Sequence, residues 1–202
     1  MTQTIEYILD LAAPNGYLAW YPLKDIAART GAELVVTPVF LGGMHKLTGN
    51  APPMIRDADV KGKVEYAMLE MRRFIAKHGY SRFTMHPQFP FNSVTFQRML
   101  LAVEGEDRIR LVETLLPALW EDGLPVDDPA AIGARLNDAG FDAAALLART
   151  QDPEIKQQLI DKTSAAVERG AFGIPTFYVK TGGKDEMFFG KERLAQMEEL
   201  LA

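Results

Sequence analysis

The sequence predicts an α/β fold in which one sheet is interrupted by a large helical insertion. Three observations indicate this fold: a strand, helix, strand pattern near the start of the chain, a strand, strand, helix pattern at its end, and a stretch without a convincing strand between them, residues 61–170. Because strands at both ends have to share a sheet, we expect residues 1–60 and 171–202 to form one discontinuous domain and residues 61–170 to be inserted into it.

The first segment has the elements of a crossover unit. Residues 5–11 form an apolar run that ends in a turn-forming stretch, which is typical of a buried strand. Residues 17–30 carry apolar side chains at helical spacing, with Pro22 as a kink, and residues 33–40 return to a β-branched pattern. A strand, helix, strand unit of this length predicts two parallel strands joined by the helix.

The middle of the chain is predicted to be a series of helices. Two of them carry a start signal, because Asp128 and Asp152 each stand as an N-cap before a proline at the first helical position. The predicted helices span residues 61–78, 93–103, 107–122, 129–138, 143–149 and 153–170. After them, the sequence predicts strands at 177–180 and 186–189, joined by a glycine turn, and a final helix at 191–201.

Composition excludes several functions. The chain has no cysteine, so it forms no disulfide and performs no thiol exchange of its own. Its net charge is −5 and its basic residues are scattered, which argues against a nucleic-acid partner. No apolar run approaches the roughly 20 residues of a membrane span, and the start does not resemble a signal peptide, so we expect a cytoplasmic protein. The three histidines show no metal-ligand spacing, and we expect no metal.

Four separated segments carry a resemblance to one family. They are residues 10–19 (Asp-Leu-Ala-Ala-Pro-Asn-Gly-Tyr-Leu-Ala), residues 41–53 with Leu-Gly-Gly and Thr-Gly-Asn-Ala-Pro-Pro, residues 89–92 (Phe-Pro-Phe-Asn), and residues 170–176 (Gly-Ala-Phe-Gly-Ile-Pro-Thr), which continue to Met-Phe-Phe-Gly at 187–190. In these segments, and across almost the whole chain, the sequence resembles 2-hydroxychromene-2-carboxylate isomerases and kappa-class glutathione transferases.

The resemblance implies a thioredoxin-like sheet with the helical insertion of the DsbA and kappa-transferase type. It implies glutathione as cofactor and a glutathione-dependent isomerase of aromatic catabolism, acting on a small unsaturated aromatic carboxylate. Two alternatives stay open because the family's usual active-site serine is Ala13 here: a conjugating transferase of kappa type, or a non-catalytic protein that binds glutathione or a peptide. The oligomeric state also stays open, with a homodimer as one option.

The same resemblance places the glutathione sulfur at the start of the first helix. There the family has Ser-Pro-Tyr-Ser and this chain has Ala13, Pro14, Asn15 and Gly16. A helix N-terminus favours an anion such as a thiolate. The missing serine hydroxyl removes a hydrogen bond to a charged acceptor, worth about 1.5–3 kcal/mol, while Asn15 offers an amide donor close by.

The remaining candidate residues are implied for the peptide part of glutathione. Ile174 and Pro175 resemble the cis-proline site of thioredoxin folds, where a free backbone pairs with an extended tripeptide. Lys191 and Glu192 begin the last helix, and Glu192 takes the role of the acid that holds the γ-glutamyl amine. Asn50 resembles the residue for the glutathione peptide. Lys63 resembles the one for its glycyl carboxylate, with Lys61 as a rival.

Overall fold

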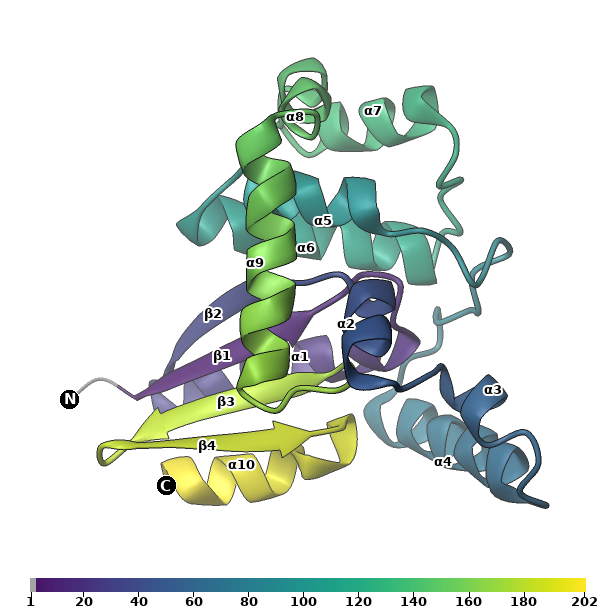
Figure 1. Cartoon of the computed structure of the whole chain (residues 1–202), viewed down its shortest axis with the longest axis vertical. Coiled ribbons are helices and arrows are strands. Elements are labelled where there is room, and N and C mark those ends of the chain that lie inside the picture. Colours follow the sequence, from purple (N-terminus) through teal and green to yellow (C-terminus); the bar gives the residue numbers. More distant parts are fainter. Residues whose placement is uncertain (1–2) are drawn as a thin grey trace.

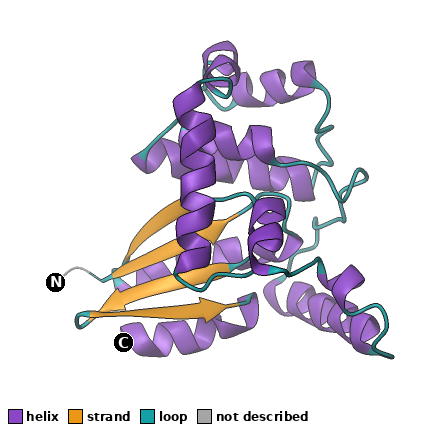
Figure 2. Cartoon of the chain, viewed as in Figure 1, coloured by secondary structure: helices purple, strands orange, loops and turns teal. Residues whose placement is uncertain are grey.

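The structure, a computed structural model, describes residues 3–202 and is built around a four-stranded sheet in the order β2-β1-β3-β4. β1 (Thr4–Leu9) pairs in parallel with β2 (Glu33–Pro38) and antiparallel with β3 (Thr176–Thr181). β4 (Lys184–Phe189) pairs antiparallel with β3 at the sheet edge. The first and last segments of the chain therefore share one sheet, as the sequence predicted (Figures 1 and 2).

Helices cover both faces of this sheet. α1 (Pro14–Thr30) and α10 (Leu194–Leu201) pack against each other on one face. α9 (Pro153–Glu168) runs across the other face, with α2 (Leu41–Thr48) packed beside it (Figure 1). The end of β1 and the start of α1 thus lie within a layer that is covered on both sides.

The regular elements between β2 and β3 are all helices, and none of residues 61–170 belongs to a strand. Its helices are α4 (Lys63–His78), α5 (Val94–Leu101), α6 (Gly105–Trp120), α7 (Pro129–Asp138), α8 (Ala143–Arg149) and α9. Before them lies the short α3 (Pro53–Arg56), which projects together with α4 from one corner of the molecule (Figure 1). The division into a discontinuous sheet domain and an inserted helical domain stays a prediction.

Several boundaries differ from those predicted. α1 begins at Pro14 rather than at residue 17, and the predicted last helix opens with a 3₁₀ turn, η1 (Lys191–Arg193), before α10. α2 and α3 were not predicted at all. α2 has two glycines in its first turn and no capping side chain of its own, so its local signals are weak.

Both predicted N-cap residues stand at the start of their helices, but only one of them caps with its side chain. The Asp128 carboxylate accepts hydrogen bonds from the backbone N–H groups of Ala130 and Ala131 and caps α7. Asp152 is likewise the N-cap residue of α9, as predicted, but its side chain makes no capping hydrogen bond. The Asp-Pro pattern placed both helix starts correctly because proline at the first turn is enough to mark one.

A continuous core joins the sheet to the helices. Tyr7 on β1 stacks on Phe177 of β3 with ring centroids 5.1 Å apart, and Trp20 of α1 lies next to it at 6.1 Å. Trp120, at the end of α6, is fully buried, and its indole N–H donates to the Leu11 carbonyl over 2.9 Å. This bond fixes the end of α6 to the segment that leads into α1.

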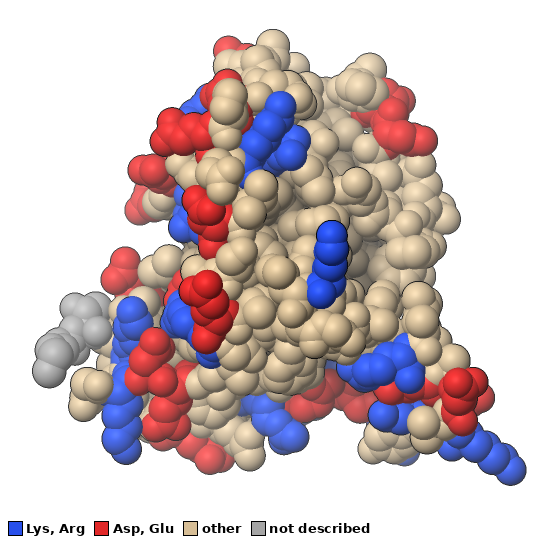
Figure 3. Space-filling view, in the orientation of Figure 1, with Lys and Arg blue, Asp and Glu red and all other residues tan. Residues whose placement is uncertain are grey.

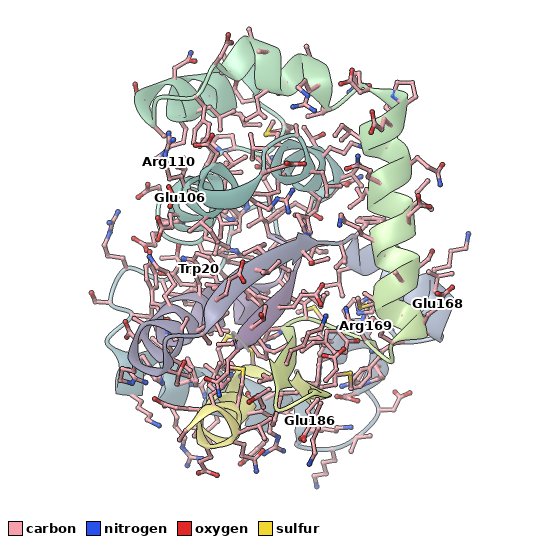
Figure 4. The ribbon with its side chains drawn as sticks, turned by 90° about the vertical axis from the view of Figure 1, so that its left-hand side faces the viewer. Trp20, Glu106, Arg110, Glu168, Arg169 and Glu186 are labelled. Carbon is pink, nitrogen blue, oxygen red and sulfur yellow. The ribbon has the colours of Figure 1, made fainter. Side chains whose placement is uncertain are left out.

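The surface carries charges of both signs. On the face shown in Figure 3 they lie mostly toward the rim, around a broad uncharged area. Arg169, at the end of α9 nearest the sheet (Figure 4), stacks over the Tyr178 ring at 3.6 Å and bonds Glu6 and Asp185. Among the described residues, no helix combines the length and the apolar character that a bilayer span requires.

Candidate functional site

The first turn of α1 has a backbone N–H group without a hydrogen-bond acceptor among the described residues. Ala13 is the N-cap residue, is 5% exposed and offers no capping side chain. Gly16 and Tyr17 donate their N–H groups to the Ala13 carbonyl, and Pro14 has no N–H. The Asn15 N–H has no acceptor among residues 3–202. One backbone donor at a helix N-terminus is therefore free for an anionic ligand.

The Asn15 side chain adds a second unpaired group. Its Oδ1 atom is buried and has no hydrogen-bond partner among the described residues. Its Nδ2 atom is not among the buried unpaired atoms and bonds no described residue, so it faces solvent. Because buried polar atoms are nearly always paired, an orphaned amide oxygen here indicates a donor that the protein itself does not supply.

A buried carboxyl supports this turn from below. Asp10 follows β1 and is fully buried, and its two oxygens accept the N–H groups of Ala12 (2.9 Å) and Leu41 (2.7 Å). Burial raises the pKa of Asp10, and the hydrogen bonds from Leu41, Ser93, Ala12 and Gln97 oppose that rise. Asp10 thus joins the turn before Pro14 to the first residue of α2.

The segment before β3 lies against the same turn. The Ile174–Pro175 bond is cis, as the resemblance implied, and a second cis bond, Phe89–Pro90, was not predicted. A Cβ atom added to Gly16 would lie 3.4 Å from Cγ2 of Ile174, so the two residues are in close approach. The N–H and C=O groups of Ile174 have no partner within residues 3–202, whereas the Pro175 carbonyl accepts the Gly190 N–H.

Asn50 reaches this segment from the loop after α2. Its Nδ2 donates to the Phe172 carbonyl over 2.7 Å, and its Oδ1 accepts from the Ala51 N–H and from Arg56 at 3.3 Å. The structure therefore places Asn50 against the segment before Ile174, which itself lies against the first turn of α1. The role of these residues in binding glutathione stays a prediction. Both ends of the Asn50 amide are engaged within the protein.

The two lysines proposed for the glycyl carboxylate differ in their surroundings. Lys63 bonds Asp57 over 2.9 Å, and Asp57 also accepts two bonds from Arg56. The hydrogen bonds from Arg56 and then Lys63 hold the pKa of Asp57 well below its ordinary value. Lys61 is exposed and has no ion pair among the described residues. Asp57 thus pairs with both Arg56 and Lys63, and Arg56 also donates to Asn50.

The start of the last helix holds a buried lysine. Lys191 is 3% exposed, and its ammonium bonds Glu192 and Glu70 of α4, with the Phe74 ring 5.1 Å away. Burial raises the pKa of Glu192, but the hydrogen bond and charge of Lys191, together with the bonds from the Glu192 backbone and Glu70, outweigh it, and the net shift is downward. Glu192 folds back so closely that a Cβ on Gly190 would lie 2.6 Å from its Oε2. The acid proposed for a ligand amine is therefore already paired.

Several residues of this site escaped the reasoning from sequence: Asp10, Arg56, Asp57 and Glu70. Asp10 belongs to one of the segments that carry the resemblance, but it was not predicted as a site residue. An acid at the end of an apolar run is itself a signal of a buried carboxyl with a specific partner. Arg56 ends the four-residue helix α3 and Asp57 follows it, and no local motif marks either of them. Glu70 contacts Lys191 across 121 residues of chain, which no local pattern reveals.

The βαβ and ββα halves of the sheet, the cis-proline segment and the helix start beside it define a thioredoxin-like protein of the DsbA class. The family model of the DSBA-like thioredoxin domain matches residues 4–202, and the chain belongs to this family.

Characterised relatives match over the full length. The chain is 28% identical to 2-hydroxychromene-2-carboxylate isomerase of Sphingobium xenophagum over 204 residues, covering 100% of this chain and 99% of the relative. It is 26% identical to human glutathione S-transferase kappa 1, covering 100% and 92%. A solved structure of 2-hydroxychromene-2-carboxylate isomerase has the same fold, with a TM-score of 0.82 at 22% identity and coverage of 98% and 94%.

Proposed function

We propose that this protein binds reduced glutathione and uses it to isomerise a small unsaturated aromatic carboxylate. The observation that carries the proposal is the meeting of three segments that are distant in sequence: Ile174 lies against Gly16 in the first turn of α1, and Asn50 donates to the Phe172 carbonyl. Relatives of this chain are named 2-hydroxychromene-2-carboxylate isomerase and glutathione S-transferase kappa, which supports the enzyme class.

The unpaired groups at this meeting point suit a short peptide thiol. The free N–H and C=O groups of Ile174 can pair with an extended ligand backbone in the manner of an added strand. The Asn15 N–H and Nδ2 can donate to a sulfur anion, and its orphaned Oδ1 can accept from a thiol or a ligand N–H. Arg56 and Lys63 share the single carboxylate of Asp57, so this cluster keeps one net positive charge for a terminal carboxylate of the ligand.

The proposed reaction requires a thiolate that is stabilised at the first turn of α1. Glutathione, when bound, supplies a nucleophile that adds reversibly to an unsaturated carbon, permits rotation and leaves unchanged. Ala13 and Pro14 provide an apolar floor without a hydroxyl, so stabilisation of the anion falls to Asn15 and the helix N-terminus. Asp10 holds the turn in place through the Ala12 N–H. We expect a higher thiol pKa here than in a site with serine at position 13.

A second candidate is a conjugating activity. It is favoured by the similarity to the human kappa-class transferase, which covers the whole chain. The same thiolate site would serve it, but the sulfur would remain attached to an electrophilic substrate instead of leaving. A binding protein without turnover would keep the Ile174 and Asn50 contacts and lack both activities.

The test is glutathione-dependent turnover. Purified protein is incubated with 2-hydroxychromene-2-carboxylate, with and without reduced glutathione, and separately with an activated aryl chloride. The proposal predicts isomerisation that requires glutathione, is inhibited by S-methylglutathione and is lost in Asn15→Ala, while Asn137→Ala on α7 retains it. Conjugation of the aryl chloride without isomerisation would favour the transferase. Isomerisation that is independent of glutathione would overturn the proposal.

A further inference from the structure

A cavity lies away from the proposed glutathione site. It has a volume of about 300 Å³ and is formed by α1, the segment that follows α4, and the end of α6. Tyr17, Tyr21 and Tyr80 form its walls, and Asp25, Arg82 and Glu121 are its charged lining residues. None of the residues proposed for glutathione lines it. We call it the tyrosine cavity.

The walls of the tyrosine cavity are aromatic faces and edges in mutual contact. The Tyr80 ring centroid lies 5.5 Å from that of Tyr17 and 6.0 Å from that of Tyr21. Tyr17 and Tyr21 meet edge to face, with an interplanar angle of 88°. Tyr21 is 38% exposed, so its ring is open to a ligand, while Tyr17 and Tyr80 form the floor.

Two of the three phenol groups are already committed. The Tyr17 hydroxyl donates to Oε1 of Glu121 over 2.8 Å, and the Tyr80 hydroxyl donates to the Leu18 carbonyl over 2.7 Å. These bonds fix both rings. The Tyr17 ring is almost fully buried and stacks on Phe83, so Tyr21, with Tyr80 beside it, offers the accessible aromatic surface of the cavity. Aromatic faces carry negative partial charge and attract cations.

The charged groups around the cavity are predominantly acidic. The Arg82 guanidinium bonds Glu121 at 3.0 Å and Asp122 at 2.7 Å, so its charge is shared between two carboxylates. Asp25, one helical turn after Tyr21 on α1, forms no ion pair among residues 3–202. The pKa of Tyr21 is raised first by burial and then by nearby carboxylates, which agrees with a negative potential.

We propose that the tyrosine cavity binds a small organic ammonium ion, held against the Tyr21 and Tyr80 rings and balanced in charge by Asp25. Aromatic walls with a neighbouring carboxylate are the arrangement that recognises alkylated ammonium groups, because such cations are weakly hydrated and gain from contact with several π faces. An anion would meet Asp25 and Glu121 and find Arg82 already engaged. This inference is independent of the proposed isomerase activity.

The test compares two ligands of the same shape. Choline and 3,3-dimethylbutan-1-ol differ only in the positive charge, and each is titrated into the full-length protein by calorimetry and by NMR of the tyrosine rings. We expect choline to bind about tenfold more tightly than the alcohol, the scale of a desolvated cation–π contact. Equal binding of the two ligands, or no choline binding at tens of millimolar, about the weakest range that calorimetry resolves, overturns the proposal.

Matched variants locate the site. Tyr21→Leu should weaken choline binding about fivefold or more, while Tyr21→Phe, which keeps the ring, should stay within about twofold of the unchanged protein. Asp25→Asn should weaken it about threefold or more by removing the unpaired charge. Tyr66→Leu, at an exposed tyrosine on α4, should change nothing. Loss of binding in Tyr66→Leu equal to that in Tyr21→Leu, or full binding in Tyr21→Leu, contradicts the assignment.

Discussion

The Tyr80 hydroxyl donates a 2.7 Å hydrogen bond to the main-chain carbonyl of Leu18, the carbonyl that Pro22 leaves without its helical partner. In an α-helix this carbonyl would accept from the N–H of the residue four positions later, and proline has none. The segment after α4 thereby supplies the hydrogen bond that α1 lacks at Leu18. This position is close to both the proposed glutathione site and the tyrosine cavity. A proline inside a helix and a distant tyrosine act as one unit.

Removing the Tyr80 hydroxyl should destabilise the protein through this carbonyl. Tyr80→Phe leaves the buried Leu18 carbonyl unpaired, and we expect a loss of about 1–3 kcal/mol in the free energy of unfolding, measured by urea denaturation. In a Pro22→Ala background the restored N–H can serve Leu18, so the loss should fall to about half or less. Additive effects of the two substitutions would show that they do not share this carbonyl.

Asp10 should make stability depend on pH in a definite direction. Burial raises its pKa in the folded state above the unfolded value of about 3.9. The folded protein therefore holds the Asp10 proton more tightly, and the stability contributed by this group is complete below about pH 3.9 and lost as the pH rises through the raised folded pKa. Asp10→Asn cannot titrate, so its curve lacks this fall.

The measurement is urea unfolding of both proteins from pH 4 to pH 8. Comparing the two curves cancels the contributions of Glu6, Glu192 and Glu198, whose folded pKa values lie below their ordinary ones and act in the opposite sense. We expect the unfolding free energy of the unchanged protein to exceed that of Asp10→Asn most near pH 4, and this difference should decrease as the pH rises. An advantage that grows with pH would mean that Asp10 is held ionised by its N–H donors.

Placing a hydroxyl at position 13 should change both the helix and the bound sulfur. Ala13→Ser puts an N-cap side chain on α1, where none is present, and should add about 1 kcal/mol to the unfolding free energy. It should also lower the pKa of bound glutathione by about one to two units, measured by thiolate absorbance against pH. Ala12→Ser is the matched control and should do neither. An unchanged thiol pKa in Ala13→Ser, together with no loss of turnover in Asn15→Ala, would show that the glutathione sulfur does not bind at the start of α1.

Lys191 should control how the protein treats the amine of glutathione. Because its ammonium already pairs with Glu192, a ligand amine gains little there, and N-acetylglutathione should bind within about threefold of glutathione. Lys191→Ser releases Glu192, and the preference for the free amine should then rise about tenfold. Lys184→Ser, in the exposed hairpin, is the control. A strong preference for the free amine in the unchanged protein would show that Lys191 yields Glu192 to the ligand.

The sequence predicted the elements whose signals are local and missed those held by distant contacts. The strands and long helices follow from apolar periodicity, prolines and glycines, which act within a few residues. α2 begins without a capping side chain of its own. Instead, the Leu41 N–H donates to the Asp10 carboxylate and the Phe40 N–H donates to the Thr163 hydroxyl. No pattern within residues 40–48 carries that information.

The same contrast applies to the candidate site. The resemblance proposed Ala13, Asn50 and Ile174 as site residues. The structure packs Ala13 and Ile174 in one cluster and bonds Asn50 to the neighbouring Phe172. It also assigned Glu192 to a ligand amine and Lys63 to a carboxylate, but the structure pairs Glu192 with Lys191 and Lys63 with Asp57. Those ion pairs depend on how the start of the last helix meets α4 and on how the loop after α3 folds back. A motif carries residue types and order but not these long-range partners.

Calorimetric titration with reduced glutathione tests the central claim most directly. We predict saturable heat from a single site at up to millimolar glutathione, reduced about tenfold in affinity by Asn50→Ala, which removes the contact to Phe172, and unchanged by the exposed control Glu199→Ala. A parallel thermal shift should follow the same order. No heat and no thermal shift at millimolar glutathione, or equal binding by Asn50→Ala and the unchanged protein, would contradict the placement of a glutathione site where α1, Asn50 and Ile174 meet.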